Sequence, residues 1–599
     1  MRKLTEDHRF ALLELILIAL GGAVWVIKPE WGLWFLLTAL LPFVLRMISS
    51  GYAPDARDGL VLVFGVTAWV GYGAAYDQTI AWSKAWLAMT AVLLYFSLKT
   101  QPAENLPRIA VFLFCLGVGV ALYFFLTHDF LALPRRLEMV NRLGRWFMSV
   151  RPQTGWTPLH PNYAAGMIAL TVPFIFYPLE TFHRRRAPLS LAWRLATGIG
   201  LTLAILALLM ATSRGVLFAI LSGAGGWLLW RLIRWGRISR QIKSEAVFPI
   251  LLMFYLGAVI VFLFAGPARS GSLITGHYYY GDGSRGELFD RSLYLLQDYA
   301  LSGGGLGSFP GLYSQYMLGI PYYNIPNSHN LFLDVGIEQG VFGGLAFFAL
   351  YLLSLWAVAR AITSAGNGQP FQWLLLFALI VTFVHGMVDD YLYNGIGTAL
   401  SLLFVGLAAN LRRREPQPDG HHINRRTALA IALIWALIAL INLNPIRAIW
   451  QANLGAVRLS QVELADFPES GWAGEWLIPL LDDAEASLHA ALQLDPANRT
   501  ANHRLGLISM YRRDFLSAAR YLELAHAQAP HHRGIIKTLA YCYVWLGDWD
   551  KARILLPQIP ETIEELDVYM WWWEAQGRSD LSLQAKLALD ALQIPADQP

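Results

Sequence analysis

The residues best suited to chemistry lie in one polar segment, between Gly281 and Gly344. It offers groups that could bind an anion or move a proton, and glycines that would let the backbone come close to a ligand. The first are Arg285, Arg291, His329 and Glu338, and the second are Gly303, Gly304, Gly305 and Gly307. Because apolar segments long enough to cross a bilayer lie on both sides, we expect a catalytic loop at a membrane face. The alternative is an ordinary extramembrane loop with scattered charges.

The composition is that of a membrane protein. Of 599 residues, 56% are hydrophobic and only 15% charged, and the mean hydropathy of +0.42 lies outside the soluble globular range. Cys115 falls in an apolar segment and Cys542 in a polar tail, so no disulfide framework is indicated. The first apolar run follows MRKLTEDHR and leads directly into others, so we expect no cleavable signal.

Apolar runs close to the roughly 20 residues needed to cross a bilayer predict about 12–13 spans. They lie near 11–27, 31–49, 59–76, 83–98, 108–126, 163–182, 191–211, 215–234, 247–266, 340–360, 371–391, 394–411 and 427–443. Lys and Arg concentrate in the even-numbered connections, as in Arg184 to Arg186 and Arg412 to Arg414. By the positive-inside rule the N-terminus is cytoplasmic, and the large loop at 267–339 and the tail are extracytoplasmic.

One outward segment, Leu133 to Val150, is rich in arginine against this rule. Its apolar residues share one helical face and Arg135, Arg142 and Arg145 lie opposite, which predicts an amphipathic helix in the membrane plane. Its arginines would bind anionic lipid head groups; the alternative is that they help to recruit a lipid-linked pyrophosphate.

The tail contains an internal repeat. Pro496 and Pro530, Leu505 and Leu539, Asp514 and Asp548, Phe515 and Trp549, and Ala518 and Ala552 are each 34 residues apart. This period is similar to that of tetratricopeptide repeats, with flanking helices at 483–494 and 566–592. We therefore expect an all-α chain: a polytopic membrane helical bundle at 1–447, followed by an extracytoplasmic α-solenoid at 448–599.

The predicted topology brings distant polar groups to the outer side of the membrane. His160 and Asn162 begin the sixth span in HPN, and Arg214 occupies the turn before the eighth in TSRG. His385, Asp389 and Asp390 mark the outer end of the eleventh, in HGMVDD. Singly, such residues are often interfacial or solvated, so their shared side is the stronger indication.

Several short motifs follow one another in a characteristic order. They are TSRG, Arg285 with GGGLGSF after it, SHNLFL, and Glu338 before GVFGG. In this combination the chain resembles the O-antigen ligase and polymerase superfamily, over roughly residues 163–411, and HPNYAAG and HGMVDD fit that pattern. Phe289 departs from it, since Trp is more usual there, and only some members carry a repeat tail.

The resemblance implies a GT-C-type glycosyltransferase, multi-pass in the bacterial inner membrane. It would transfer a glycan from an undecaprenyl-diphosphate carrier to an acceptor hydroxyl on the extracytoplasmic face. Arg214 and Arg285 would grip the diphosphate and His329 would orient or deprotonate the acceptor, roles that suit a bidentate cation and an imidazole. We expect a surrounding substrate-binding set of Arg291, His160, Asn162, Asn330, Glu338, Tyr323 and Asp389.

The outward loop has few carboxylates and no DxD spacing, which favours metal-independent and cofactor-free catalysis, with inversion if attack is direct and in line. The alternative is a metal site formed by Glu338 with Asp389 and Asp390. Glu338 could instead hold an arginine in place. Outward tyrosines, Tyr323 among them, could stack on glycan or belong to an interfacial belt.

Two other functions remain open. Thirteen spans suit a transporter, although the sequence shows no inverted repeat, and the tail suits a membrane-anchored scaffold for polysaccharide assembly. For the enzyme, the acceptor could be a lipid-A core sugar, another carrier-linked glycan or a protein hydroxyl. The expected partners are the donor, the acceptor, membrane lipid and a protein bound by the repeats, with no nucleic acid.

Overall fold

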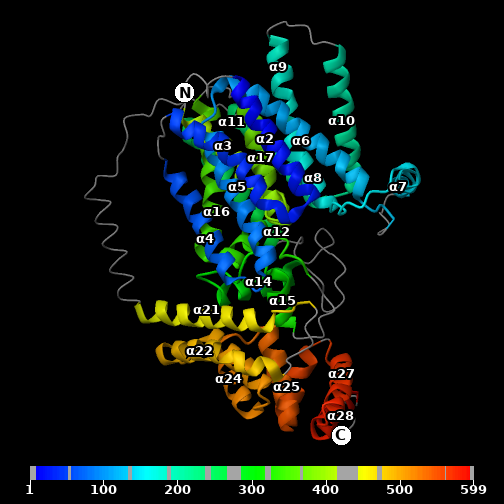
Figure 1. Ribbon diagram of the computed structural model, residues 1–599, viewed down its shortest axis with the longest axis vertical. Helices are drawn as coiled ribbons and strands as arrows, with labels where there is room; N and C mark the ends of the chain where they lie inside the picture. The colour runs from blue at the N-terminus through cyan, green and yellow to red at the C-terminus, as the bar shows by residue number, and fades with distance from the viewer. Residues whose placement is uncertain are drawn as a thin grey trace.

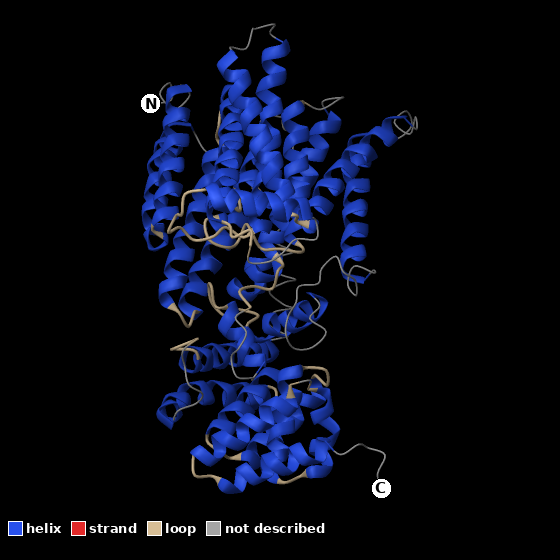
Figure 2. Cartoon of the chain, turned by 90° about the vertical axis from the view of Figure 1, so that its right-hand side faces the viewer, coloured by secondary structure: helices blue, strands red, loops and turns tan. Residues whose placement is uncertain are grey.

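The computed structural model describes residues 8–50, 55–131, 138–184, 191–235, 244–265, 285–317, 325–364, 369–413, 443–468, 475–559 and 561–593. Within these ranges the regular elements are all helices, and no strand occurs (Figure 2). A bundle of long helices occupies one part of the molecule and a stack of shorter helices lies at one end of it. The expected all-α class is confirmed.

The bundle is built from helices that follow most of the predicted spans. They are α2 (His8–Ile27), α3 (Gly32–Ser50), α4 (Ala56–Ala74), α5 (Gln78–Lys99), α6 (Leu106–Thr127), α8 (Pro161–Thr171), α9 (Phe176–Arg184), α10 (Leu191–Ala211), α11 (Arg214–Trp235), α12 (Ser244–Ala265), α16 (Leu331–Ser364), α17 (Pro370–Gly386), α18 (Gly397–Leu400) and α19 (Leu403–Arg413).

Eight of the described segments are long and apolar enough to cross a membrane. Three further apolar helices are shorter, at Gly32–Arg46, Pro370–Gly386 and Gly397–Leu411. The expected span at 59–76 corresponds to α4, which is not among the eight but exposes Leu62 and Val66 on one face. The expected span at 427–443 lies almost wholly outside the described residues. The chain is a multi-pass membrane protein.

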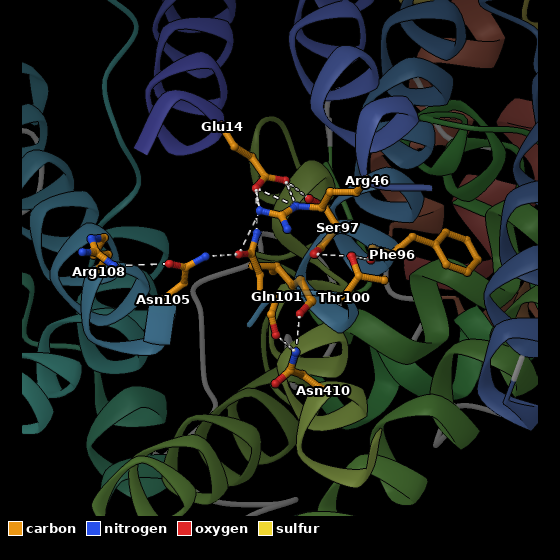
Figure 3. Close-up of polar contacts among 10 residues, drawn as sticks. Glu14, Arg46, Phe96, Ser97, Thr100, Gln101, Asn105, Arg108 and Asn410 are labelled. Carbon is orange, nitrogen blue, oxygen red and sulfur yellow. Dashed lines mark hydrogen bonds and ion pairs between the residues drawn. The ribbon is translucent and has the colours of Figure 1, made fainter. Parts of the chain in front are cut away.

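A buried polar network ties the first helices of the bundle together (Figure 3). The Arg46 guanidinium on α3 donates to the Glu14 carboxylate of α2 at 2.6 Å, and to Gln101 Oε1 at 3.0 Å. Both charged side chains are at most 2% exposed. Asn410 of α19 completes the network, since its amide donates to three backbone carbonyls at the end of α5, those of Leu98, Lys99 and Gln101. Charges buried in an apolar bundle require such partners.

The expected amphipathic segment forms α7 (Glu138–Val150), while residues 132–137 lie outside the described part. Val140 and Gly144 are buried, with Gly144 against Phe130, and Met139 and Trp146 remain exposed. Arg142 and Arg145 pair with Glu138 of the same helix, at 3.7 and 2.6 Å. The helix lies at the side of the bundle in Figure 1.

The tail forms α21 (Leu443–Glu463), α22 (Asp482–Leu494), α23 (Arg499–Tyr511), α24 (Phe515–Gln528), α25 (Arg533–Leu546), α26 (Trp549–Leu555), α27 (Thr562–Ala575) and α28 (Ser579–Gln593). Residues at equivalent positions of the 34-residue repeat have the same structural role. Asp514 caps α24 and Asp548 caps α26, and Ala518 and Ala552 are both fully buried. The domain boundary expected at 447/448 falls inside α21.

The repeat helices lie at the end of the bundle opposite the start of α2 (Figure 1). Two short helices from the large loop, α14 (Arg285–Asp298) and α15 (Phe309–Met317), lie between bundle and repeats. These two helices of the segment that is expected to be catalytic therefore lie between the two domains.

Candidate active site

The end of α17 joins the motifs that carry the three expected catalytic residues. Gly215, the residue after Arg214, packs closely on this end, because a Cβ there would lie 3.1 Å from Val388 and 3.3 Å from the His385 ring. On the other side, the Asn330 amide, next to His329, donates to the Met387 carbonyl at 3.4 Å. The TSRG and SHN motifs are thus held at one helix end, as the topology predicted.

A cavity of about 480 Å³ brings the third motif to the same place. It is lined by Gly286 from the first turn of α14, by Asn330, and by Met387. The rest of its wall is mostly apolar and comes from α12, α14 and α16, including Phe264, Phe289, Phe332, Leu345 and Phe348. Arg285 is the residue before Gly286 and begins α14, and its side chain lies outside the described part.

Two of these motifs contain a strained backbone. Thr212 and His329 have φ values of 50° and 55°, in the left-handed region that side chains other than glycine rarely adopt. His329 is held there because its N–H donates to Asn327 Oδ1 at 3.0 Å. Strain of this kind costs about 1–3 kcal/mol and tends to occur at functional sites. Both strained residues lie within two positions of an expected catalytic residue.

Around His329, the neighbouring side chains secure the start of α16. Asn330 Oδ1 accepts from the N–H groups of Phe332 and Leu333, both at 3.1 Å, and Asp334 Oδ1 accepts from the Ser328 N–H at 2.9 Å. Asn330 therefore acts as a helix cap. Asn330 also lines the cavity, and only that part of its surface could contact a substrate, as was expected of it.

The HPNY and HGMVDD motifs meet directly. Asn162 donates to the Asp389 carboxylate at 2.7 Å, and the Tyr163 hydroxyl donates to Asp390 at 2.7 Å. That hydroxyl also accepts from Asn327, at 3.1 Å, and from Asn394, at 3.0 Å. Tyr163, absent from the expected site, thus links three motifs. Its place beside Asn162 in HPNY was the only sequence signal for it.

Among the described residues Glu338 pairs with a lysine, where the sequence suggested an arginine as a possible partner. Lys84 Nζ of α5 lies 2.6 Å from Glu338 Oε2 and 3.9 Å from the centre of the Tyr393 ring. The Gln339 amide donates to the Tyr393 hydroxyl at 2.8 Å. Lys84 was missed because it is one lysine within a predicted span.

The glycine-rich turn approaches the protein's own backbone. A Cβ on Gly303, whose φ is +73°, would lie 2.2 Å from the Glu338 carbonyl oxygen, and one on Gly305 would lie 2.3 Å from Ala75. The Gly304 N–H donates to the Ile337 carbonyl at 2.7 Å. These glycines let the turn dock on α16 and on the end of α4, so their close backbone approach is to the protein's own helices.

Replacing Gly303 by alanine should therefore destabilise the fold and reduce its activity. The left-handed φ and the backbone clash together should cost about 2–5 kcal/mol. Thermal unfolding of the purified protein measures this loss. Gly73→Ala is the matched control, because a Cβ there has nothing within 4 Å, and it should leave the unfolding temperature unchanged or slightly higher. Equal stability of the two variants would contradict the packing described.

The remaining expected residues are distributed as follows. Arg291 donates to the Tyr313 hydroxyl at 3.3 Å, is not among the residues that line the cavity, and has its pKa lowered by burial. His160 is exposed and precedes α8, with its ring 5.1 Å from that of Tyr163. Tyr323 lies outside the described residues. Arg214 is exposed at the start of α11.

In the described part of the chain, the metal alternative finds no support at Glu338, Asp389 and Asp390. Three potential ligand atoms lie within 4.8 Å of one another in a different group, Asp298, His503 and His532, at the junction with the repeats.

Comparison with known families agrees with the domain order. Residues 199–348 match the family model described as O-antigen ligase, and residues 509–567 match the one described as tetratricopeptide repeat. No curated protein and no solved structure matches the chain. The suspected resemblance is confirmed, and the first match indicates glycan transfer by a membrane protein. The matched segment contains Arg214, Arg285, Arg291, His329, Asn330 and Glu338.

Proposed function

We propose that this protein transfers a glycan from a polyprenyl-diphosphate carrier, undecaprenyl diphosphate in bacteria, to an acceptor hydroxyl on the extracytoplasmic face of the inner membrane. The observation that carries the proposal is the shared cavity, which is lined by the first turn of α14, by Asn330 beside His329, and by Met387, whose neighbour Val388 lies next to the TSRG turn. These are the segments of the chain that supply two arginines and an imidazole.

The wall of the cavity suits the lipid part of such a donor. Phe264, Phe332 and Phe348 present aromatic surface, and Leu293 and Leu345 are exposed at its edge. A polyprenyl chain in the bilayer would pack on this surface by van der Waals contact, without burying unpaired polar groups. The diphosphate would then lie at the polar end, near Asn330 and the start of α14.

The chemistry requires charge stabilisation and removal of one proton. The acceptor oxygen attacks the anomeric carbon, the bond from that carbon to the diphosphate breaks, and the acceptor proton passes to His329. Negative charge grows on the leaving diphosphate, and Arg214 and Arg285 stabilise it without a metal ion. Attack opposite the leaving group inverts the anomeric centre.

The other polar residues would support this arrangement. The Asn162–Asp389 and Tyr163–Asp390 hydrogen bonds fix the ends of α8 and α17 against Asn327, two residues before His329. The Lys84–Glu338 pair fixes the first turns of α16. Such partners hold reacting groups in place and lower the reorganisation needed for reaction.

Mass spectrometry of a defined reaction tests the proposal. The purified full-length protein in lipid nanodiscs would be incubated with an undecaprenyl-diphosphate oligosaccharide and three acceptors: a lipid-A core, a second carrier-linked glycan and a serine-containing peptide. We expect one acceptor to gain the mass of the glycan while free undecaprenyl diphosphate is released, also in excess chelator.

Two results would overturn parts of this proposal. Movement of the donor across the bilayer without any glycan transfer would favour a transporter. If no acceptor gains glycan but the repeat domain still binds a partner protein, a scaffold would be favoured. A strict requirement for a divalent cation would refute the metal-independent mechanism alone.

A further inference from the structure

Helix α14 connects the candidate active site to the repeat domain. Gly286, Phe289 and Asp290 near its start line the cavity, whereas Asp298 at its end is buried against α23. Asp298 lies thirteen positions after Arg285 in the same helix, a distance of about 20 Å at 1.5 Å per residue. A tilt at one end of so short a helix is transmitted to the other.

The carboxylate of Asp298 accepts hydrogen bonds from two arginines of the repeat domain. Arg499 and Thr500 donate to its Oδ1 at 2.5 Å each, and Arg504 donates to its Oδ2 at 3.5 Å. Burial alone would raise the pKa of Asp298, but the two guanidinium groups hold it below its ordinary value. The carboxylate is therefore charged, and its contacts with the repeat domain are charge-assisted.

The same arginines contact the residues that flank Asp298. Arg504 donates to the Tyr299 hydroxyl at 3.3 Å and to Gln315 Oε1 of α15 at 3.5 Å. Arg499 lies 5.4 Å from the centre of the Tyr294 ring, within cation–π range. Helix α21 also binds this part of the loop. Its Asn453 Oδ1 accepts from the N–H groups of Leu301 and Ser302, directly before the glycine-rich turn.

The alternative explanation of this junction is a metal site, since Asp298, His503 and His532 could bind an ion. The guanidinium groups of Arg499 and Arg504 already hydrogen-bond both carboxylate oxygens, and their positive charges oppose a further cation. Burial lowers the pKa of His532, to about 3, and that of His503, so both imidazoles are neutral and the arginines are the cations that pair with Asp298. The cluster is better explained as a packed junction between two parts of one chain.

We propose that Arg499 and Arg504 are positioning residues for glycan transfer: through Asp298 they hold α14 so that its first turn stays at the cavity. The inference rests on the proposed function and adds a role for the repeat domain within the enzyme itself. The first helix of the first repeat unit, α23, then acts on the chain's own loop. Protein partners would bind elsewhere on the repeats.

Hydrogen exchange and transfer, measured together on the full-length protein, test the proposal. The first variant carries both Arg499→Ala and Arg504→Ala. The second, Asp298→Asn, weakens the same contact from the membrane domain and replaces the first if that one does not fold. We expect faster amide exchange across residues 285–298, unchanged exchange in α27 and α28, and a fall of about 10²-fold in transfer, as for a small misplacement of reacting groups. Arg499→Lys with Arg504→Lys should restore part of both.

The control is Arg512→Ala, because Arg512 pairs with Asp482 and Glu485 inside the repeat domain. It should alter neither the exchange of α14 nor transfer. Transfer that falls without a change in α14 exchange would overturn the positioning role, and so would faster exchange with wild-type transfer. If the unaltered protein transfers no glycan, the proposed function fails, and the exchange measurement still decides whether the repeats hold α14.

Discussion

Replacing Arg285 by alanine should lower the rate of glycan transfer by about 10²–10³-fold, the usual effect of removing one group that stabilises developing negative charge. Arg285→Lys should recover only part of the rate, because an ammonium lacks the planar two-pronged donor set of arginine. The measurement is product formation at saturating acceptor, with the amount of inserted protein determined separately.

Arg142→Ala provides the matched control for this prediction. Arg142 is an exposed arginine of α7 that pairs with Glu138, and its loss should leave the rate close to that of the unaltered protein. The reverse pattern, with Arg142 needed and Arg285 dispensable, would move diphosphate binding from the cavity to the amphipathic helix.

Replacing His329 by glycine should separate activity from stability. Loss of the imidazole removes the proposed base and should reduce transfer by about 10²–10⁴-fold. The φ of 55° is unfavourable for histidine and free for glycine, and this gain offsets the greater flexibility of glycine in the unfolded chain. We therefore expect stability within about 1 kcal/mol of the unaltered protein.

Thermal unfolding and product formation on the same samples check this pair of expectations. A variant that retains transfer would exclude His329 as the base. A variant that unfolds at a much lower temperature would show that the histidine side chain supports the fold.

Local patterns in the sequence were enough to predict the architecture. Apolar runs marked most helices of the bundle, and the 34-residue period predicted helices that Asp514 and Asp548 do cap. The approach of Asn162 to Asp389 followed from topology alone, because both were expected at the outer ends of spans. Features that follow from a sequence period, or from the side of the membrane on which a residue lies, were therefore predictable.

Pairings between helices were not predictable in this way. Lys84 and Glu338 are 254 positions apart (338 minus 84), and their contact depends on how α5 and α16 are rotated against each other. The same holds for Glu14 and Arg46, which form a buried pair between α2 and α3. The contacts of the glycine-rich turn likewise depend on backbone approach, which composition does not encode.

The Asn410 side chain also constrains the order of biogenesis. Its amide supplies the hydrogen bonds to the carbonyls of Leu98, Lys99 and Gln101, and it leaves the ribosome about three hundred residues after them. A nascent chain that has inserted only its early helices lacks the Asn410 donor, and water or lipid head groups can take its place at these carbonyls. The packing of α19 against α5 therefore forms late in synthesis, after the other described helices of the bundle have been made.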